Sequence, residues 1–450
     1  STVNWIGYSA LEGCSRLTGP LNLPTNLRKI EEYAFYYCSG LTGDLSLPAT
    51  LTKLGSYSFY GCSGLNGSVN IQKNLNTIGA YPFLLCNNLT AFNVNMNNSL
   101  LASADGVLFS KNLDTLLIFP GAKGASYTIP ASVRVLKDYS FYNCSKLTGS
   151  FDIPSNIDSV GNYAFFGCSQ LSAFTTNSGN ARYKAQDGVL YSADMKRIIV
   201  YPALAAGGFT IPETVERIEA SAFANCSGLT GTILLPEKLR FIGDYAFYGC
   251  EQLTGFDVSP ANSRYSAKDN ILYSKALDSL FICPLSISGN FTAPFTVKYI
   301  GYSAFDGCEK ITEINLPSTV NYIDNYAFNN CTGLTKVRLN ENVNTIGSSA
   351  FYSCSALQRF EFNRMSPPTV DYYTLEGINK STCNLVIPYY ATANYMAANY
   401  WNQFSNITES NFDDTAVPVT VKRNFNVTTS ESNVKITGFD PGESVRIYDL

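Results

Sequence analysis

One short pattern returns throughout this chain and constrains its fold more than any other feature. The copy at Ile30–Leu41 reads I-E-E-Y-A-F-Y-Y-C-S-G-L, and eleven copies keep a Cys at the same point. An aliphatic residue stands eight before each Cys, Phe stands three before it in ten copies, and Leu or Ile stands three after it. Such a fixed period is typical of solenoids, propellers and arrays. The repeat cysteines are Cys14, Cys38, Cys62, Cys86, Cys144, Cys168, Cys226, Cys250, Cys308, Cys331 and Cys354.

The spacing of these cysteines divides the repeats into two kinds. Neighbouring cysteines lie 23 or 24 residues apart in most copies, but three spacings of 58 residues contain a 35-residue insert. Each insert carries a D-G-V-L-Y-like run, beginning at Asp105, Asp187 and Asp269. Asp-Gly and Asp-Asn between alternating apolar residues are turn signals. Each insert is therefore expected to form a hairpin plus one or two extra strands that keep the sheet continuous.

Within a repeat, the residues after the Cys read as a strand. Leu45 and Leu47 alternate with polar residues, and Pro48 ends the run because proline cannot donate into a strand ladder. The A-F-x-x-C segment is expected to turn the chain as a short helical or 3-10 turn. One such coil buries too little apolar surface to fold alone, so the coils must stack.

Three regions follow from this pattern. Residues 1–365 are predicted to form the solenoid of eleven Cys-centred repeats, three of them with inserts. Residues 366–410 are predicted to form a C-terminal capping element, in which Tyr389 to Phe404 have helical spacing and would cover the open edge of the sheet. Residues 411–450 are predicted to form a small β domain. Its strands are expected at Val419–Val421, Val434–Ile436 and Val445–Ile447, and we expect it to be incomplete because the chain stops in the last of them.

Composition excludes several classes of function. The chain has no histidine, which rules out Ser-His-Asp and Cys-His catalysis and histidine metal ligands. A net charge of −4 offers no basic patch, so we expect no nucleic-acid partner. No apolar run approaches the roughly 20 residues of a membrane span, and no export signal is visible. The chain opens in mid-repeat, so we expect that a preceding segment, which could have carried an export signal, was removed.

The thirteen cysteines are interpreted as buried thiols that act as small hydrophobes. Eleven come one per repeat, and equivalent side chains in stacked coils point inward in parallel rather than at each other, which argues against bridges. Disulfides and metal thiolates remain the alternatives.

The chain resembles the BspA-like leucine-rich repeat family of bacterial surface proteins. The resemblance rests on the run I-G-x-Y-A-F-x-G-C-x-x-L-T-x-x-x-L-P, seen at Ile242–Leu253 and Ile300–Pro317, and on the D-G-V-L-Y-S inserts. It implies a right-handed, curved leucine-rich repeat solenoid with a parallel β-sheet. It also implies a secreted or cell-surface protein of the gut Bacteroides type, used for adhesion or for binding a host protein. The family has no shared catalytic motif.

One candidate binding surface is the outward position of each repeat strand, which is mostly small and polar. The alternative is a solvated sheet face with no ligand. The candidate residues are Asn22, Ser46, Asn70, Asn93, Asp152, Thr175, Asp257, Asn315, Arg338 and Glu361.

A second candidate is a ladder of tyrosines two residues before the Cys. Tyrosine is favoured at interfaces because it combines apolar area with a hydroxyl. The alternative, which we favour, is that each ring stacks on its equivalent in the next coil. The candidate residues are Tyr36, Tyr60, Tyr142, Tyr248 and Tyr352.

No catalytic residue, metal site or cofactor is predicted. The Asp-Gly pairs of the inserts lack the density of carboxylates that calcium sites need. The expected function is therefore non-enzymatic binding of a macromolecule, a protein or a glycan, by a monomer outside the cell. The alternatives are a glycan-binding or glycan-processing accessory protein and a structural spacer.

Overall fold

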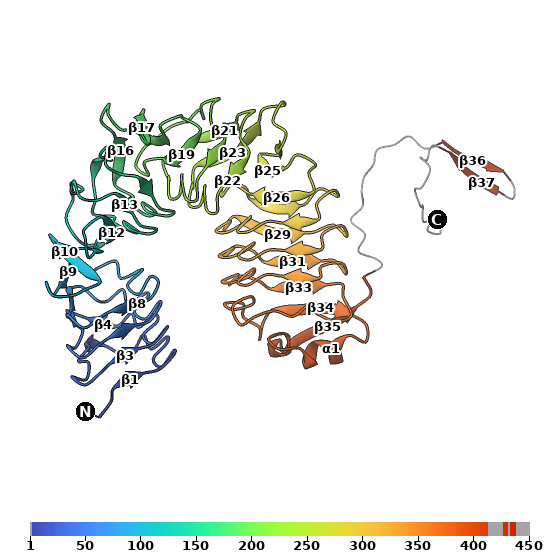
Figure 1. Cartoon of the computed structure of the whole chain (residues 1–450). Helices are drawn as coiled ribbons and strands as arrows, with labels where there is room; N and C mark the ends of the chain where they lie inside the picture. The colour runs from blue at the N-terminus through green and yellow to red at the C-terminus, as the bar shows by residue number, and fades with distance from the viewer. Residues whose placement is uncertain (1, 413–425, 431–432, 438–450) are drawn as a thin grey trace. The chain divides into compact units, whose positions relative to one another are not determined.

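The computed structural model describes residues 2–412, 426–430 and 433–437, and the chain divides into two compact units, Ser1–Glu409 and Ser410–Leu450. The first unit is a solenoid of stacked coils, built almost entirely from short strands (Figure 1). Strands of neighbouring coils pair in parallel, with equivalent repeat positions opposite each other. The predicted parallel solenoid is confirmed.

Two ladders of strands run along the stack. The short ladder contains the aliphatic residue eight before each Cys. Its strands are β1 (Trp5–Ile6), β3 (Lys29–Ile30), β6 (Lys53–Leu54), β8 (Thr77–Ile78), β13 (Val135–Leu136), β15 (Ser159–Val160), β20 (Arg217–Ile218), β22 (Phe241–Ile242), β28 (Tyr299–Ile300), β30 (Tyr322–Ile323) and β32 (Thr345–Ile346). The strand face contains the longer strands that carry the alternating apolar residues. Its strands are β5 (Leu45–Ser46), β7 (Ser68–Ile71), β9 (Ala91–Val94), β14 (Gly149–Asp152), β16 (Leu171–Thr175), β21 (Gly231–Leu235), β23 (Leu253–Val258), β27 (Gly289–Thr292), β29 (Ile311–Asn315), β31 (Lys336–Leu339) and β33 (Arg359–Phe362). Near the N-terminus, β2 (Gly19–Pro20) pairs with β4 (Leu41–Thr42).

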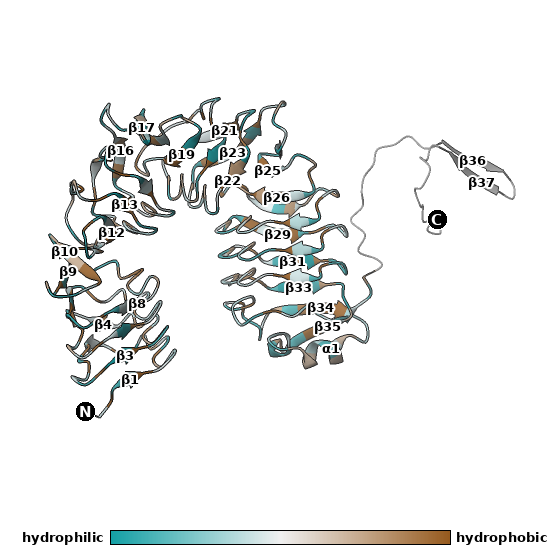
Figure 2. Cartoon of the chain, viewed as in Figure 1, coloured by the Kyte–Doolittle hydropathy of each residue, from teal (hydrophilic) through white to brown (hydrophobic). Residues whose placement is uncertain are grey.

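The core lies between the two ladders, and its side chains stack from coil to coil. Along the strand face, Leu45 and Leu47 are buried while Ser46 is exposed, and Figure 2 shows the same alternation of hydrophilic and hydrophobic residues on these strands. Phe35 stacks on Phe59 with ring centroids 4.8 Å apart. Because the rings repeat in register, each coil supplies the apolar partner that its neighbour lacks.

The A-F-x-x-C segment is a run of turns, so the expectation of a helical or 3-10 turn is wrong. The residues five before and one before the Cys both adopt left-handed backbone in every coil, for example Tyr57 at φ 55° and Gly61 at φ 71°. Two left-handed residues break the segment into successive tight turns. Its backbone N–H groups then alternate between two kinds of hydrogen bond. The N–H of Cys62 donates to the carbonyl of Phe59 inside the turn, whereas the N–H of Phe59 donates to the carbonyl of Pro82 in the next coil.

Each insert forms the predicted hairpin. In the first insert, β10 (Leu101–Ala104) and β11 (Val107–Ser110) are antiparallel and meet at Asp105-Gly106, whose φ angles of 47° and 70° suit a two-residue hairpin turn. A third strand then joins the short ladder in parallel. The other strands of the inserts are β12 (Thr115–Ile118), β17 (Tyr183–Gln186), β18 (Val189–Ser192), β19 (Arg197–Val200), β24 (Tyr265–Lys268), β25 (Ile271–Ser274) and β26 (Ser279–Ile282).

The inserts interrupt the sheet, so the expectation that they keep it continuous is wrong. Within residues 2–412, the strand face is divided into sheets of three, two, two and six strands, and the short ladder breaks at the same inserts. The central hairpin strand lies between two cores. Leu108 packs with the coils before it, whereas Val107 and Phe109 pack with the coils after it. This arrangement explains why the D-G-V-L-F run is apolar on both faces of its strand.

The repeat cysteines are buried apart from Cys14, which confirms their interpretation as core residues. They also make a contact that the sequence did not reveal. Between coils without an insert, each thiol lies 3.0–3.2 Å from a carbonyl oxygen of the preceding coil, as in Cys62 to Phe35 and Cys86 to Phe59. Across an insert the same contact lengthens to 3.6–3.9 Å.

An asparagine precedes each hairpin and was also missed; it is buried in the first and third inserts and half-buried in the second. Asn262, 1% exposed, donates from Nδ2 to the carbonyls of Pro236 and Leu239, and its Oδ1 accepts from the N–H groups of Arg264 and Tyr265. Both polar atoms of the amide therefore have partners. Asn98 and Asn180 make the equivalent contacts in the other two inserts.

After the last repeat, the sheet gains two more strands, β34 (Asn384–Pro388) and β35 (Asn406–Ser410). Between them lie α1 (Thr392–Ala397) and the 3-10 turn η1 (Trp401–Gln403), a shorter helical stretch than the sequence predicts. The described helices are too short to span a membrane.

In the second unit, β36 (Asn426–Ser430) and β37 (Asn433–Thr437) form an antiparallel pair. The expected strand at Val434–Ile436 lies in β37, and those at Val419–Val421 and Val445–Ile447 lie outside the described residues.

Candidate functional site

The strand face brings its outward side chains into rows, because register pairs equivalent residues of successive coils. On the first sheet, Ser46 lies opposite Asn70 and Asn70 opposite Asn93. Asn93 Nδ2 donates to Asn70 Oδ1 across 2.9 Å, and Asn70 Nδ2 donates to Ser46 Oγ across 3.2 Å. This part of the face is an uncharged amide ladder whose groups largely satisfy one another.

The two middle sheets carry isolated acidic groups. Asp152 lies opposite Thr175, whose hydroxyl donates to Asp152 Oδ1 across 3.0 Å. Asp257 lies opposite Leu234, an exposed apolar residue, and its Oδ1 accepts from the N–H of Val258. Each of these sheets has two strands, so no extended row forms here.

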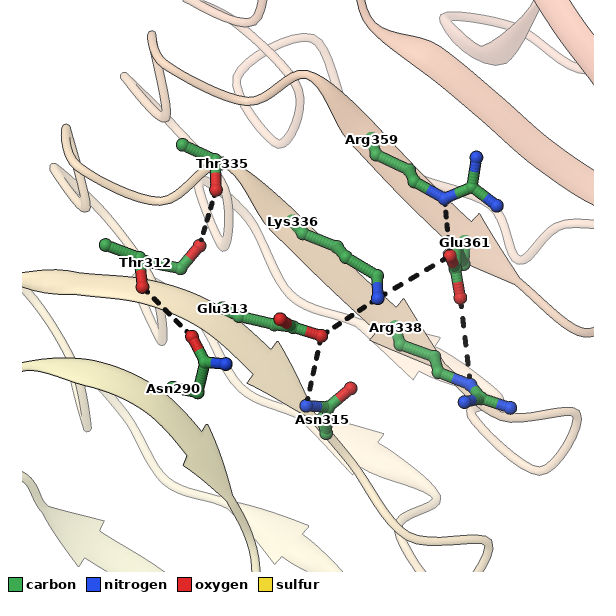
Figure 3. Close-up of polar contacts among 9 residues, drawn as sticks. All are labelled: Asn290, Thr312, Glu313, Asn315, Thr335, Lys336, Arg338, Arg359 and Glu361. Atoms are coloured by element: carbon green, nitrogen blue, oxygen red, sulfur yellow. Dashed lines mark hydrogen bonds and ion pairs between the residues drawn. The ribbon is translucent and has the colours of Figure 1, made fainter. Parts of the chain in front are cut away.

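The last sheet holds a charged network on β29, β31 and β33 (Figure 3). Glu361 accepts from Arg359 Nε at 2.5 Å, and it lies 3.7 Å from Arg338 Nε and 3.9 Å from Lys336 Nζ. Lys336 also pairs with Glu313 at 2.9 Å. The Lys336 ammonium, as hydrogen-bond partner, holds the pKa of Glu313 below its usual value.

The position of Glu361 corrects the expectation that the outward residues are solvated. Its side chain is 7% exposed, whereas Arg359 is 44% exposed. Three cationic side chains cover the carboxylate, so the network presents guanidinium and ammonium groups to solvent and keeps its central anion beneath them.

Some of the other residues of this network were predicted from the sequence and some were not. Asn315 and Arg338 lie on the network, as predicted, and Asn315 Nδ2 donates to Glu313 Oε1 across 3.3 Å. Glu313, Lys336 and Arg359 were missed. They stand two residues before predicted outward positions. Because alternate side chains of a strand point to the same face, this spacing is the sequence signal that would have identified them. Asn22 is exposed but lies in none of the described strands.

The tyrosine ladder is largely engaged in joining coils. Tyr36 stacks on Tyr60 at 4.9 Å, and Tyr142 stacks on Phe166 at 4.9 Å. Burial raises the pKa of Tyr36, Tyr60, Tyr142 and Tyr248. Tyr352 is partly exposed. Because the stacked faces contact neighbouring rings, they are not available to a ligand, and the strand face is the better candidate surface.

Among the described residues, no group of three or more Cys, Asp or Glu side chains could hold a metal ion. The carboxylates of the strand face are either paired with cations, like Glu361, or widely separated on different sheets, like Asp152 and Asp257.

Several solved structures are similar to this chain. A leucine rich cell surface protein from Faecalibacterium prausnitzii A2-165 is 22% identical, with 86% of this chain and 84% of that chain covered and a TM-score of 0.40. The pneumococcal vaccine antigen PcpA is 17% identical, with 91% and 84% covered and a TM-score of 0.36. A leucine-rich repeat protein from Bacteroides ovatus ATCC 8483 is 22% identical, with 80% and 76% covered and a TM-score of 0.29. A search of curated proteins gave no match.

The family assignment rests on a model of the repeat itself. The BspA type leucine rich repeat region matches residues 1–110, 116–204, 203–287 and 278–392, which include all the Cys-centred coils and, apart from residues 111–115, the three inserts. These residues form the parallel solenoid described above. The chain therefore belongs to the BspA-type leucine-rich repeat family.

Proposed function

We propose that this chain is a secreted or cell-surface bacterial protein that binds a macromolecular partner through the strand face and catalyses no reaction. The observation that supports this best is the charged network on β29, β31 and β33. It places three cationic side chains around a buried carboxylate on a rigid sheet. Export is inferred from the family, whose members are bacterial surface proteins.

The network favours a partner with an acidic surface. Lys336, Arg338 and Arg359 carry three positive charges against two negative charges on Glu313 and Glu361, and Glu361 is the most buried of the five. Charge complementarity of this kind guides encounter and orients the partner. Since the side chains already hold one another in place, little of their freedom is lost on binding.

The experiment compares two arginine variants of the purified chain. Arg338 lies on the strand face, whereas Arg134 makes an exposed ion pair with Asp158 beside the short ladder, away from that face. Binding to a panel of immobilised host matrix proteins is measured by surface plasmon resonance, and a glycan array is tested in parallel. We expect Arg338→Ala to weaken binding of an acidic protein at least tenfold and Arg134→Ala to leave it unchanged.

The array distinguishes the alternatives. Binding to an anionic glycan that depends on Arg338 would replace the protein partner with a glycan. Release of sugar from the array would overturn the non-enzymatic assignment. Equal binding by both variants would overturn the strand face as the binding surface, provided that circular dichroism shows both to be folded.

A further inference from the structure

Each insert opens a cavity between two coils, at the point where the short ladder breaks. In the third insert, the cavity of about 260 Å³ lies between the turn segment after β22 and the coil that contains Cys283 and Tyr302. The first insert has an equivalent cavity of about 300 Å³ beside β8, and the second has one of about 120 Å³ beside β15. The three cavities are therefore related by the internal repeat, and their linings can be compared position by position.

The cavity of the third insert contains a buried acid that the other two lack. Asp306 lines it and is 8% exposed, whereas the equivalent residues, two before the Cys, are Tyr142 and Ala224. Asp306 has no ion-pair partner among the described residues. Its Oδ1 accepts a hydrogen bond from Asn329 Nδ2 at 2.9 Å, and the side chains of Asn330 and Ser303 lie beside it as further donors. Asn329 Oδ1 is itself buried without a donor from this part of the chain. The carboxylate therefore has neutral hydrogen-bond donors but no counter-ion, and burying an unpaired charge is costly.

Three tyrosine rings form walls of the same cavity. Tyr245 meets Tyr248 at 87° with centroids 5.6 Å apart, and it meets Tyr302 at 81° and 5.4 Å. The Tyr302 hydroxyl donates to that of Tyr245 across 3.0 Å. Across coils without an insert, Tyr33 and Tyr57 are stacked at 14°, whereas Tyr57 and Tyr81 are tilted at 51°. At the third insert, Tyr245, Tyr248 and Tyr302 meet edge to face and together line the cavity.

We propose that this cavity binds the protonated end of a primary organic amine, with Asp306 as its counter-ion and Tyr245, Tyr248 and Tyr302 around it. Tyrosine faces attract cations, and a carboxylate beside them supplies the opposite charge. A primary ammonium also brings three hydrogen-bond donors, which the Asp306 carboxylate and the tyrosine hydroxyls can accept. A metal ion is the poorer match, because no group of three or more ligating side chains is present in the described residues. Asp244 and Arg264 also line the cavity, and Arg264 is exposed to solvent.

The amine could belong to a free small molecule or to a lysine side chain of another protein. Both present the same alkylammonium group, so the test uses separate probes. Isothermal titration calorimetry of the whole chain at pH 8 is carried out with n-butylamine hydrochloride, with Nα-acetyl-lysine methylamide, and with tetramethylammonium chloride. The third probe carries the charge without any donor.

We expect n-butylamine to bind and Asp306→Asn to weaken its affinity at least tenfold. The matched control is Glu12→Gln, which removes an exposed carboxylate from the same position of the first coil. Tyr302→Phe should weaken binding severalfold, since it removes the hydroxyl that fixes Tyr245. A lysine source is indicated if the acetyl-lysine probe binds at least as tightly as n-butylamine, and a free amine if it does not bind.

Absence of n-butylamine binding, equal affinity in Asp306→Asn, or tighter binding of tetramethylammonium would each overturn the proposal. Thermal melting of each variant shows whether a lost signal reflects unfolding. If Asp306→Asn is unfolded, Tyr302→Phe, which keeps the apolar ring, provides the deciding measurement. The cavity contains no residue of the charged network, so a failure of the amine proposal and a failure of the proposed strand-face function are separate results.

Discussion

The thiol of Cys62 lies 3.1 Å from the carbonyl oxygen of Phe35 and so joins one coil to the coil before it. The same contact recurs along the stack, which explains why the repeat keeps Cys rather than another small apolar residue. Alanine would fill part of the space but would remove one of the two donors that reach the Phe35 carbonyl, the other being the N–H of Cys38. The cysteines therefore act both as core residues and as weak hydrogen-bond donors between coils.

Replacing Cys62 with Ala should therefore destabilise the solenoid. We expect a loss of about 1–2 kcal/mol in the free energy of unfolding, from the missing donor and the lost sulfur contacts. The control is Cys14→Ala, because Cys14 is exposed. Urea denaturation followed by circular dichroism measures both. Equal effects of the two substitutions would contradict a bonding role for the buried thiols.

Burial should also protect these thiols from alkylation. It raises the pKa of Cys38 to about 11 and the pKa of Cys86 to about 12, so at pH 8 both are neutral and unreactive. In a brief reaction of the native chain with iodoacetamide, peptide mapping should find Cys14 modified and the twelve buried cysteines unmodified. After denaturation in urea all thirteen should react. Rapid modification of Cys62 in the native chain would show that the coils open readily.

The buried asparagines of the inserts should be more sensitive than exposed ones. Asn262→Ala leaves the N–H groups of Arg264 and Tyr265 without their acceptor and removes one donor from each of two carbonyls, so we expect a loss of about 3 kcal/mol. Asn74, which is exposed and makes one such bond, should lose less than about 1 kcal/mol when changed to Ala. The same urea assay compares them. A loss at Asn262 no larger than at Asn74 would mean that the hairpin does not depend on its amide.

The sequence predicts the coils and hairpins well because their signals are periodic. The alternation of Leu45 and Leu47 marks a strand, and Asp105-Gly106 marks a hairpin turn, whatever surrounds them. The turn segment was mistaken for a helical turn because a spacing of three between Phe59 and Cys62 fits both structures. Nothing in the sequence indicates that Tyr57 adopts left-handed backbone, which is uncommon for tyrosine.

The site was harder to predict than the fold. The sequence placed Arg338 and Glu361 on one surface, but the burial of Glu361 depends on three cations, Arg359 of its own strand and two from the neighbouring strand. The cavity around Asp306 depends on how the insert separates two coils, which spacing alone does not show.

The charged network should respond to salt. Glu361→Gln leaves Lys336, Arg338 and Arg359 without their shared anion, and we expect a loss of about 2 kcal/mol at low ionic strength. Part of the loss should disappear in 0.5 M NaCl, since ions screen the repulsion between the three cations. The control is Asp257→Asn, which removes an exposed carboxylate of another sheet. Thermal melting at the two salt concentrations checks the difference. A loss independent of salt would indicate a packing defect instead.

The carboxyl of Asp306 gives the stability of the unliganded chain a distinctive dependence on pH. Burial raises its pKa from 3.8 to about 7 in the folded chain, although hydrogen bonds from neighbouring side chains, Asn329 first, oppose the shift. The unfolded chain therefore releases this proton at lower pH than the folded chain does. Between about pH 4 and pH 7 the folded state binds more protons, so a rising pH lowers the free energy of unfolding.

Comparison with Asp306→Asn isolates this contribution from the other carboxyl groups. The wild type should lose stability relative to the variant as pH rises from 4 to 7, by on the order of 4 kcal/mol, and the difference should stay constant from pH 8 to 9. Tyr245, Tyr248 and Tyr302, which line the cavity, have raised pKa values and remain neutral over this range. Urea midpoints at half-unit steps of pH measure the curve. A difference that does not change between pH 4 and 7 would show that Asp306 ionises normally, and the cavity would then offer an amine a carboxylate that is already well solvated.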